Sequence, residues 1–163
     1  MKCIITTLVI ATLMLNTKAK ADFPFTMKDT AKQLTATAKK LDLPIRFKNK
    51  SCSSDVKSTC QFSAGSLAGI ALGDIGGRVD SITVIFAGGS DAMEGLIAWG
   101  TLIALTNPSF SPNERGAILR SMSTALQDNE ELDLVKGDVR YQTIHNSTVG
   151  IWFIATSIPE QQN

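Results

Sequence analysis

Hydrophobic positions change their spacing once within the longest apolar run outside the N-terminus, Val79–Leu105. Residues Val84–Phe86 are β-branched or aromatic without interruption, which is typical of a strand covered on at least one face. The pair Gly88-Gly89 ends this stretch. Apolar residues then recur at helical spacing, at Met93, Ile97, Gly100 and Ala104. The pattern predicts a buried strand, a tight turn and a buried helix that together can organise a core.

Two further helices are predicted, one on each side of this unit. Before it, apolar residues recur every three or four positions behind a candidate N-cap at Thr26, and Pro44 ends the pattern. They are Met27, Ala31, Leu34, Ala38 and Leu41. After it, Ser111 and Glu114 match a capping box, with proline between them at the first helical position. This last helix is expected to span residues 112–127.

The chain after the first helix alternates apolar and polar residues, the period-two pattern of a half-buried strand. Ile45 and Phe47 point to one side, and three cations, Arg46, Lys48 and Lys50, point to the other.

Cys52 and Cys60 are the only cysteines outside residues 1–21. An even pair of cysteines in an exported chain predicts a disulfide. The bond would clip the strand at 45–50 to a partner strand at 60–63, forming a hairpin.

The order of the elements predicts the fold class. Strands expected at 67–73 and 79–86 continue the first hairpin across a turn at 74–77, and two more are expected at 139–145 and 149–158. The last strand carries apolar residues on both faces, which places it near the middle of the sheet. We therefore predict an α+β fold: a mainly antiparallel sheet of five to six strands with an N-terminal helix and a central helix pair packed on it.

The first 21 residues match a secretory signal, with a cation at Lys2, an apolar stretch at Ile4–Leu15 and small residues at positions 19 and 21. The apolar stretch is shorter than the roughly 20 residues that a spanning helix needs. We expect residues 1–21 to be a signal peptide. Residues 22–163 are expected to be a single exported domain, periplasmic or secreted, without a transmembrane segment.

The formal net charge is +1, from 16 basic and 15 acidic residues. Lys2, Lys18 and Lys20 lie in the expected signal, so the exported part carries a net charge of −2. This balance excludes a general nucleic-acid binder, for which a clearly basic domain is expected. Residues 22–60 hold eight cations and four acids. That excess can steer an acidic partner, or it can cancel in space as an ordinary solvated surface.

One pattern points to catalysis. Residues 88–92 resemble a degenerate nucleophile elbow around Ser90, and Asp138 and His145 follow in the order serine, acid, histidine. A chain with a single histidine satisfies this order easily, and an antiparallel sheet is not the scaffold of that motif. The simpler interpretation makes Ser90 or Asp91 the N-cap of the central helix.

No cofactor or metal site is expected. His145 is the only histidine, and no cysteine or carboxylate cluster with ligand spacing accompanies it. The glycines at 88–89 precede a helix, but the chain lacks both a P-loop lysine motif and a full dinucleotide fingerprint.

Two features are candidates for binding a partner. The row Arg46, Lys48 and Lys50 marks either a strand edge that resists pairing or a patch for an acidic protein. Trp99 lies off the main apolar stripe of the central helix, which is therefore apolar nearly all round. Such a helix is either buried in the core or docked on a partner.

The sequence favours a non-enzymatic protein-interaction module, such as an inhibitor, an immunity factor or an envelope-assembly factor, with an acidic protein as its partner. Two alternatives stay open. One is a small serine hydrolase using Ser90 and His145, and the other is a carrier of a lipid or another apolar ligand, which requires a sizeable apolar cavity.

Overall fold

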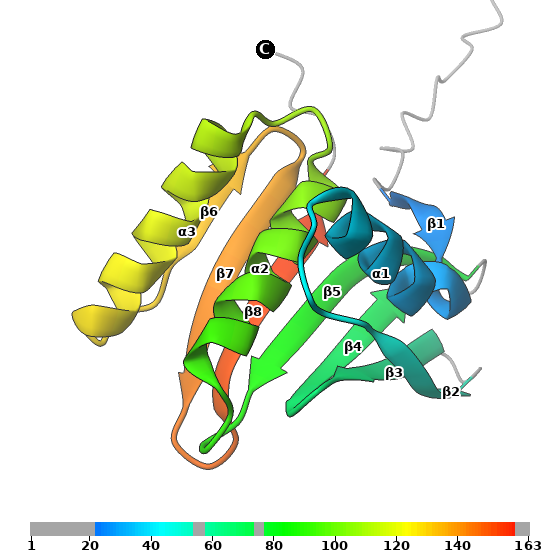
Figure 1. The fold of residues 1–163 in the computed structure, drawn as a ribbon, viewed down its shortest axis with the longest axis horizontal. Coiled ribbons are helices and arrows are strands. Elements are labelled where there is room, and N and C mark those ends of the chain that lie inside the picture. Colours follow the sequence, from blue (N-terminus) through cyan, green and yellow to red (C-terminus); the bar gives the residue numbers. More distant parts are fainter. Residues whose placement is uncertain (1–21, 54–57, 74–76, 159–163) are drawn as a thin grey trace, which may run out of the picture.

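The computed structural model describes residues 22–53, 58–73 and 77–158. These residues form an α+β fold with an antiparallel sheet and three α-helices, as the sequence predicts at this coarse level (Figure 1). The predicted signal peptide lies outside the described residues, and so does most of the turn predicted at 74–77.

The elements follow one another in this order: β1 (Phe23–Thr26), the 3₁₀ turn η1 (Met27–Asp29), α1 (Thr30–Lys40), β2 (Lys48–Ser53), β3 (Ser58–Ala64), β4 (Leu67–Gly73), β5 (Arg78–Phe86), α2 (Ala92–Thr106), α3 (Pro112–Gln127), β6 (Asp133–Lys136), β7 (Val139–Asn146) and β8 (Gly150–Ser157).

The sheet has eight strands, so the prediction of five to six was wrong. Seven of them follow the order β2-β3-β4-β5-β8-β7-β6, and β1 pairs with β5 off this path. The two strands that the prediction missed, β1 and β6, have four residues each. A strand of four residues shows too little alternation of apolar and polar side chains to be predicted. It forms because it pairs with a neighbouring strand. For β6 the usable signal was the two-residue turn Gly137-Asp138, where Gly137 has a φ of +61°.

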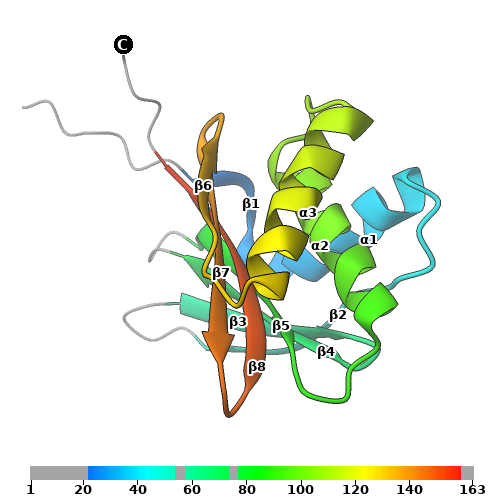
Figure 2. The same cartoon turned by 90° about the vertical axis from the view of Figure 1, so that its left-hand side faces the viewer.

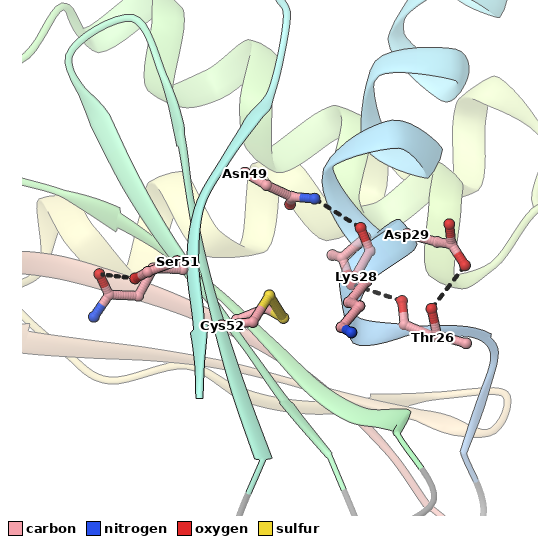
Figure 3. The surroundings of a disulfide bond; sticks show 9 residues. Thr26, Lys28, Asp29, Asn49, Ser51 and Cys52 are labelled. Atoms are coloured by element: carbon pink, nitrogen blue, oxygen red, sulfur yellow. Dashed lines mark hydrogen bonds between the residues drawn. A yellow bond between two sulfur atoms is a disulfide. The ribbon is translucent and has the colours of Figure 1, made fainter. Parts of the chain in front are cut away.

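The first helix begins later than predicted. Thr26 belongs to β1, and its hydroxyl donates to the Asp29 carboxylate at 2.7 Å (Figure 3). That hydroxyl makes no cap bond to a backbone N–H, and the chain passes through the 3₁₀ turn before α1 starts at Thr30. Thr26 is thus the N-cap of the 3₁₀ turn, as predicted by position, but its side chain does not cap the helix and α1 itself has Asp29 as its N-cap.

Two local predictions are confirmed. Cys52 and Cys60 form a disulfide between register partners on β2 and β3. In α3, Ser111 accepts from the Glu114 backbone N–H, and the Glu114 carboxylate accepts from the Ser111 N–H at 2.7 Å. The capping box depends on residues three positions apart, where spacing determines the geometry, whereas the disulfide follows from the even number of cysteines outside residues 1–21.

The three helices lie on one side of the sheet (Figure 2). Their shared core contains a line of aromatic rings in which Trp99 of α2 packs against Phe86 and Phe153, and Tyr141 stacks on Phe153. The buried residues of α2 include Gly95, Ala98 and Leu102, whereas Met93 is 61% exposed. The stripe predicted to start at Met93 is thus displaced around the helix, because α2 has few polar residues to mark its outer side.

A buried polar cluster ties the end of α2 to β7. Asn107 donates to the Tyr141 hydroxyl at 2.6 Å, and Thr106 lies 2.9 Å from the same oxygen. Because the Thr106 hydroxyl donates to the Leu102 carbonyl, Tyr141 is the donor to Thr106. Burial raises the pKa of the Tyr141 phenol, and the hydrogen bond that Asn107 donates to the phenol oxygen opposes that shift only partly.

Tyr141 is the only tyrosine of the chain, so an alkaline titration followed by phenolate absorbance reports this residue alone. A raised folded-state pKa stabilises the fold below the unfolded value of about 10, and that stabilisation is lost as the pH rises toward the folded pKa. We expect phenolate to form only as the protein unfolds, with both changes at the same pH. Phenolate formation on an intact fold, near the ordinary pKa, would contradict this assignment.

Candidate functional site

An open groove of about 880 Å³ lies beside the C-terminal end of α1. We call it the α1–β2 groove. One wall is the last turns of α1 with the segment that leads into β2, and the other is the β3–β4 turn with the first turn of α2. Figure 1 shows where these elements lie in the fold. Its lining residues are Thr35, Lys39, Asp42, Leu43, Pro44, Ile45, Arg46, Lys48, Gly65 and Glu94.

The first wall is shaped by the way α1 ends. Asp42 has a φ of +54°, a left-handed conformation that aspartate tolerates better than most residues. The Leu43 N–H donates back to the Ala38 carbonyl at 2.9 Å, and the Asp42 N–H donates to the Lys39 carbonyl at 3.2 Å. These bonds close a Schellman-type end, which turns the chain away from the helix axis and leaves Lys39 and Asp42 exposed at the groove.

A single threonine holds the segment before β2 against α1. The Thr35 hydroxyl accepts from the Phe47 N–H at 2.9 Å and donates to the Phe47 carbonyl at 3.1 Å. Ile45 and Phe47 are each 6% exposed, and the Phe47 ring meets Phe62 edge-on. Arg46 and Lys48 alternate with these buried residues and are exposed along the groove.

The opposite wall is a latch between α2 and the β3–β4 turn. The Glu94 carboxylate accepts from the Ser66 hydroxyl at 2.6 Å and from the Ser66 N–H at 3.1 Å. Gly65 makes this approach possible, because a Cβ there would lie 1.6 Å from a Glu94 carboxylate oxygen. Its φ of +55° also favours glycine. The latch therefore fixes the position of one acid in the groove.

The charges of the groove favour an acidic ligand. The lining contains three cations, Lys39, Arg46 and Lys48, and two acids, Asp42 and Glu94. The Glu94 carboxylate is already hydrogen-bonded to Ser66. Leu43 and Ile45 add apolar surface to the lining. An open groove with a charged border suits a segment of another protein better than a small apolar molecule, for which pockets are more enclosed and more apolar.

The three cations of the predicted binding row do not all lie in this groove. Arg46 and Lys48 line it, whereas Lys50 falls at a β-bulge, since Asn49 pairs with Phe62 and Ser51 already pairs with Gln61. Asn49 donates to the Lys28 carbonyl of η1 at 2.7 Å, which anchors β2 near the bulge (Figure 3). The bulge interrupts the regular alternation on which the prediction of a single row rested. Lys50 is exposed but is not among the lining residues.

Trp99, the other residue predicted to bind a partner, is 4% exposed and belongs to the aromatic core. Of the two interpretations of its helix, burial is the one this geometry matches.

The residues of the hydrolase hypothesis do not form a triad with Asp138. Asp138 precedes β7 and His145 is the last residue but one of that strand, so a rise of about 3.3 Å per residue separates their Cα atoms by roughly 20 Å. His145 Nδ1 instead lies 3.0 Å from the Asn129 side-chain oxygen. Asp91 is the N-cap of α2, as in the simpler interpretation, and its carboxylate accepts from the Met93 N–H at 2.8 Å.

Within residues 22–53, 58–73 and 77–158, no three histidine, cysteine or acidic side chains gather closely enough to hold a metal ion. None of the described helices is long and apolar enough to cross a membrane. No protein-family model, curated protein or solved structure matches the chain.

The latch predicts a coupled response to mutation. Gly65→Ala should lower the free energy of unfolding by about 2 kcal/mol, because the new Cβ displaces the Glu94 carboxylate and the positive φ becomes strained. In a Glu94→Ala background the same substitution should cost only about 1 kcal/mol, since only the strain remains. Urea denaturation of the four proteins gives the coupling.

Gly88→Ala is the matched control, because nothing lies within 4 Å of a Cβ built there and its φ is not positive. It should change stability by less than about 0.5 kcal/mol. Equal costs of Gly65→Ala with and without Glu94 would contradict the latch.

Proposed function

We propose that this protein is an exported, non-enzymatic interaction module that binds an acidic segment of a partner protein in the α1–β2 groove. The observation that carries the proposal is the placement of Lys39, Arg46 and Lys48 around one open groove, which Leu43 and Ile45 also line. Complementary charge of this kind raises the association rate and selects acidic partners.

The groove is held in shape by interactions that involve little of its charge. Thr35 fixes the segment between α1 and β2, and the Cys52–Cys60 disulfide fixes β2 to β3. The exposed cations Lys39, Arg46 and Lys48 thus extend from a scaffold that is ordered before any partner binds. Preorganisation of this kind lowers the entropic cost of association.

The disulfide supports a role outside the cytoplasm, because such bonds persist mainly in oxidising compartments. Export through the predicted signal peptide places the groove where an acidic partner is either another exported protein or the exposed part of an envelope protein.

Charge reversal in the groove tests the proposal. The Arg46→Glu/Lys48→Glu double variant should lose capture of the partner from the source cell envelope, because like charges would then face the acidic segment. Capture by the unmodified protein should weaken as ionic strength rises, since exposed charges are screened within about 10 Å at 0.1 M salt. Bound proteins are identified by mass spectrometry.

The control is Lys32→Glu/Arg120→Glu, which changes the net charge by the same amount at exposed positions on α1 and α3. Both double variants should keep the thermal midpoint within a few degrees, because no side-chain hydrogen bond of Arg46 or Lys48 to another described residue holds the fold. A partner that the control loses as readily as the groove variant, or that both variants retain, rules out the groove as the binding site.

A further inference from the structure

The face of the sheet opposite the helices carries a continuous apolar surface. In β4, β7 and β8, one set of alternate residues faces the helices and a second set faces away. In β5 a bulge near the start shifts the alternation, and after it Ser81, Thr83 and Ile85 belong to the set that faces away. We call the surface made by the second set the open face. Its large apolar members are Ile70 and Leu72 on β4, Ile85 on β5, Ile144 on β7, and Trp152 and Ile154 on β8.

Strand register brings these side chains together. Trp152 pairs with Ile85 on one side and with Ile144 on the other, so the three form a row across β5, β8 and β7. The next row across the sheet contains Ile154, Thr83 and Ile70, because Ile154 pairs with Thr83 and Thr83 pairs with Ile70. Paired residues in antiparallel strands have Cβ atoms about 5 Å apart, so the rows form one patch and not a scatter of single residues.

No described helix covers this patch, because α1, α2 and α3 all lie on the other side of the sheet (Figure 2). Ile85 is 8% exposed and Thr83 is 5% exposed, since their neighbours on the sheet shield them. Leu72 and Ile144 are each 37% exposed. The centre of the patch is thus nearly buried and its edges are partly exposed, which is typical of a surface that binds a flat partner.

Charge is absent from the centre of the open face. In the rows where the four central strands pair with one another beyond the bulge of β5, the only charged residue of this set is Arg140, and its guanidinium is paired with Asp133 of β6. Arg78 and Asp80 of β5 lie outside those rows, at and before the bulge. Lys48 lies at the opposite margin, where it pairs with Ser63 of β3. A surface without net charge at its centre meets an identical surface without repulsion, which is the condition for an isologous two-fold contact.

Shape and area point to the same occupant. A twisted sheet is complemented best by another sheet of the same twist, packed at about −30° and about 10 Å away. Strand spacing and rise give the face from β3 to β7 roughly 500 to 600 Å² per copy, so two copies bury about 1,000 to 1,200 Å² in total. That area reaches the lower limit of specific interfaces.

We propose that the open face binds a second copy of this chain, and that the protein forms a sheet-to-sheet homodimer with the helix layers outward. The small interface gives a reversible dimer with a Kd on the order of micromolar. This proposal does not depend on the α1–β2 groove, which meets the open face only at Lys48 on its margin.

Sedimentation velocity of the full chain, expressed with its own N-terminus and purified as it accumulates, tests the dimer. The sedimentation coefficient should rise from the monomer to the dimer value over a concentration range around the Kd. Leu72→Lys/Ile144→Lys should raise the Kd at least about 100-fold, because two copies would then bury unpaired like charges against each other. Both positions are partly exposed, so the fold should tolerate the lysines.

The matched control is Met93→Lys/Leu96→Lys, which places two lysines at exposed apolar positions of α2 on the helix side. It should leave the Kd unchanged. If the lysines on the open face prevent folding, Leu72→Ser/Ile144→Ser replaces them and should weaken the dimer about tenfold. Acrylamide quenching of Trp152 should also fall as the wild-type protein dimerises, whereas Trp99 is already buried.

Three results would overturn the proposal. One is a monomer at every concentration up to several hundred micromolar. Another is a dimer that survives Leu72→Lys/Ile144→Lys and therefore uses a different surface. The third is a monomer that binds phosphatidylcholine vesicles through the open face, with binding lost in the same variant, which would assign the face to lipid.

Discussion

The position of α2 against the two central strands is the constraint on which the rest of this structure depends. Trp99 packs its ring against Phe86 at 6.3 Å and Phe153 at 5.8 Å between centroids, which joins the helix to both β5 and β8. At the start of the helix, a Cβ on Gly95 would lie 2.8 Å from the Phe86 ring, so glycine permits the close approach. That approach places Glu94 over Gly65 and so forms one wall of the groove. The same helix contacts α1 on one side and α3 on the other.

The fold was predictable where neighbours in sequence determine the geometry. The capping box of α3 depends on residues within a few positions of each other, and it is present. The predictions that failed concern tertiary contacts. β6 is held by pairing with β7 and by the Asp133–Arg140 ion pair. A four-residue strand is too short for its hydrophobic pattern to predict the pairing or the ion pair. Likewise, the buried side of α2 is decided by which rings of the sheet lie under it.

The groove could be predicted only from one of its walls. Arg46 and Lys48 were visible because they alternate with buried residues, and this alternation survives in the structure although Arg46 precedes the strand. Lys39 and Asp42 lie only a few residues away, but their place in the groove depends on the left-handed end of α1. Glu94 joins them across about fifty residues of sequence through its bonds to Ser66. The available signals in the sequence were Asp42 after the first helix and Gly65 between two strands. Neither residue indicates that the two segments lie beside the same groove.

The sequence of β8 reflects both faces of the sheet, the face covered by the helices and the open face. Apolar residues occupy both of its faces, which indicates a strand covered on both sides, and β8 does lie inside the sheet between β5 and β7. The described helices satisfy only one side of that pattern, where Phe153 and Ala155 are fully buried. Trp152 and Ile154 belong to the other side, so their apolar character is explained by a layer that the described chain does not itself provide. If that layer is a second copy, the dimer carries two grooves, and a partner with two acidic segments would gain avidity without any additional contact.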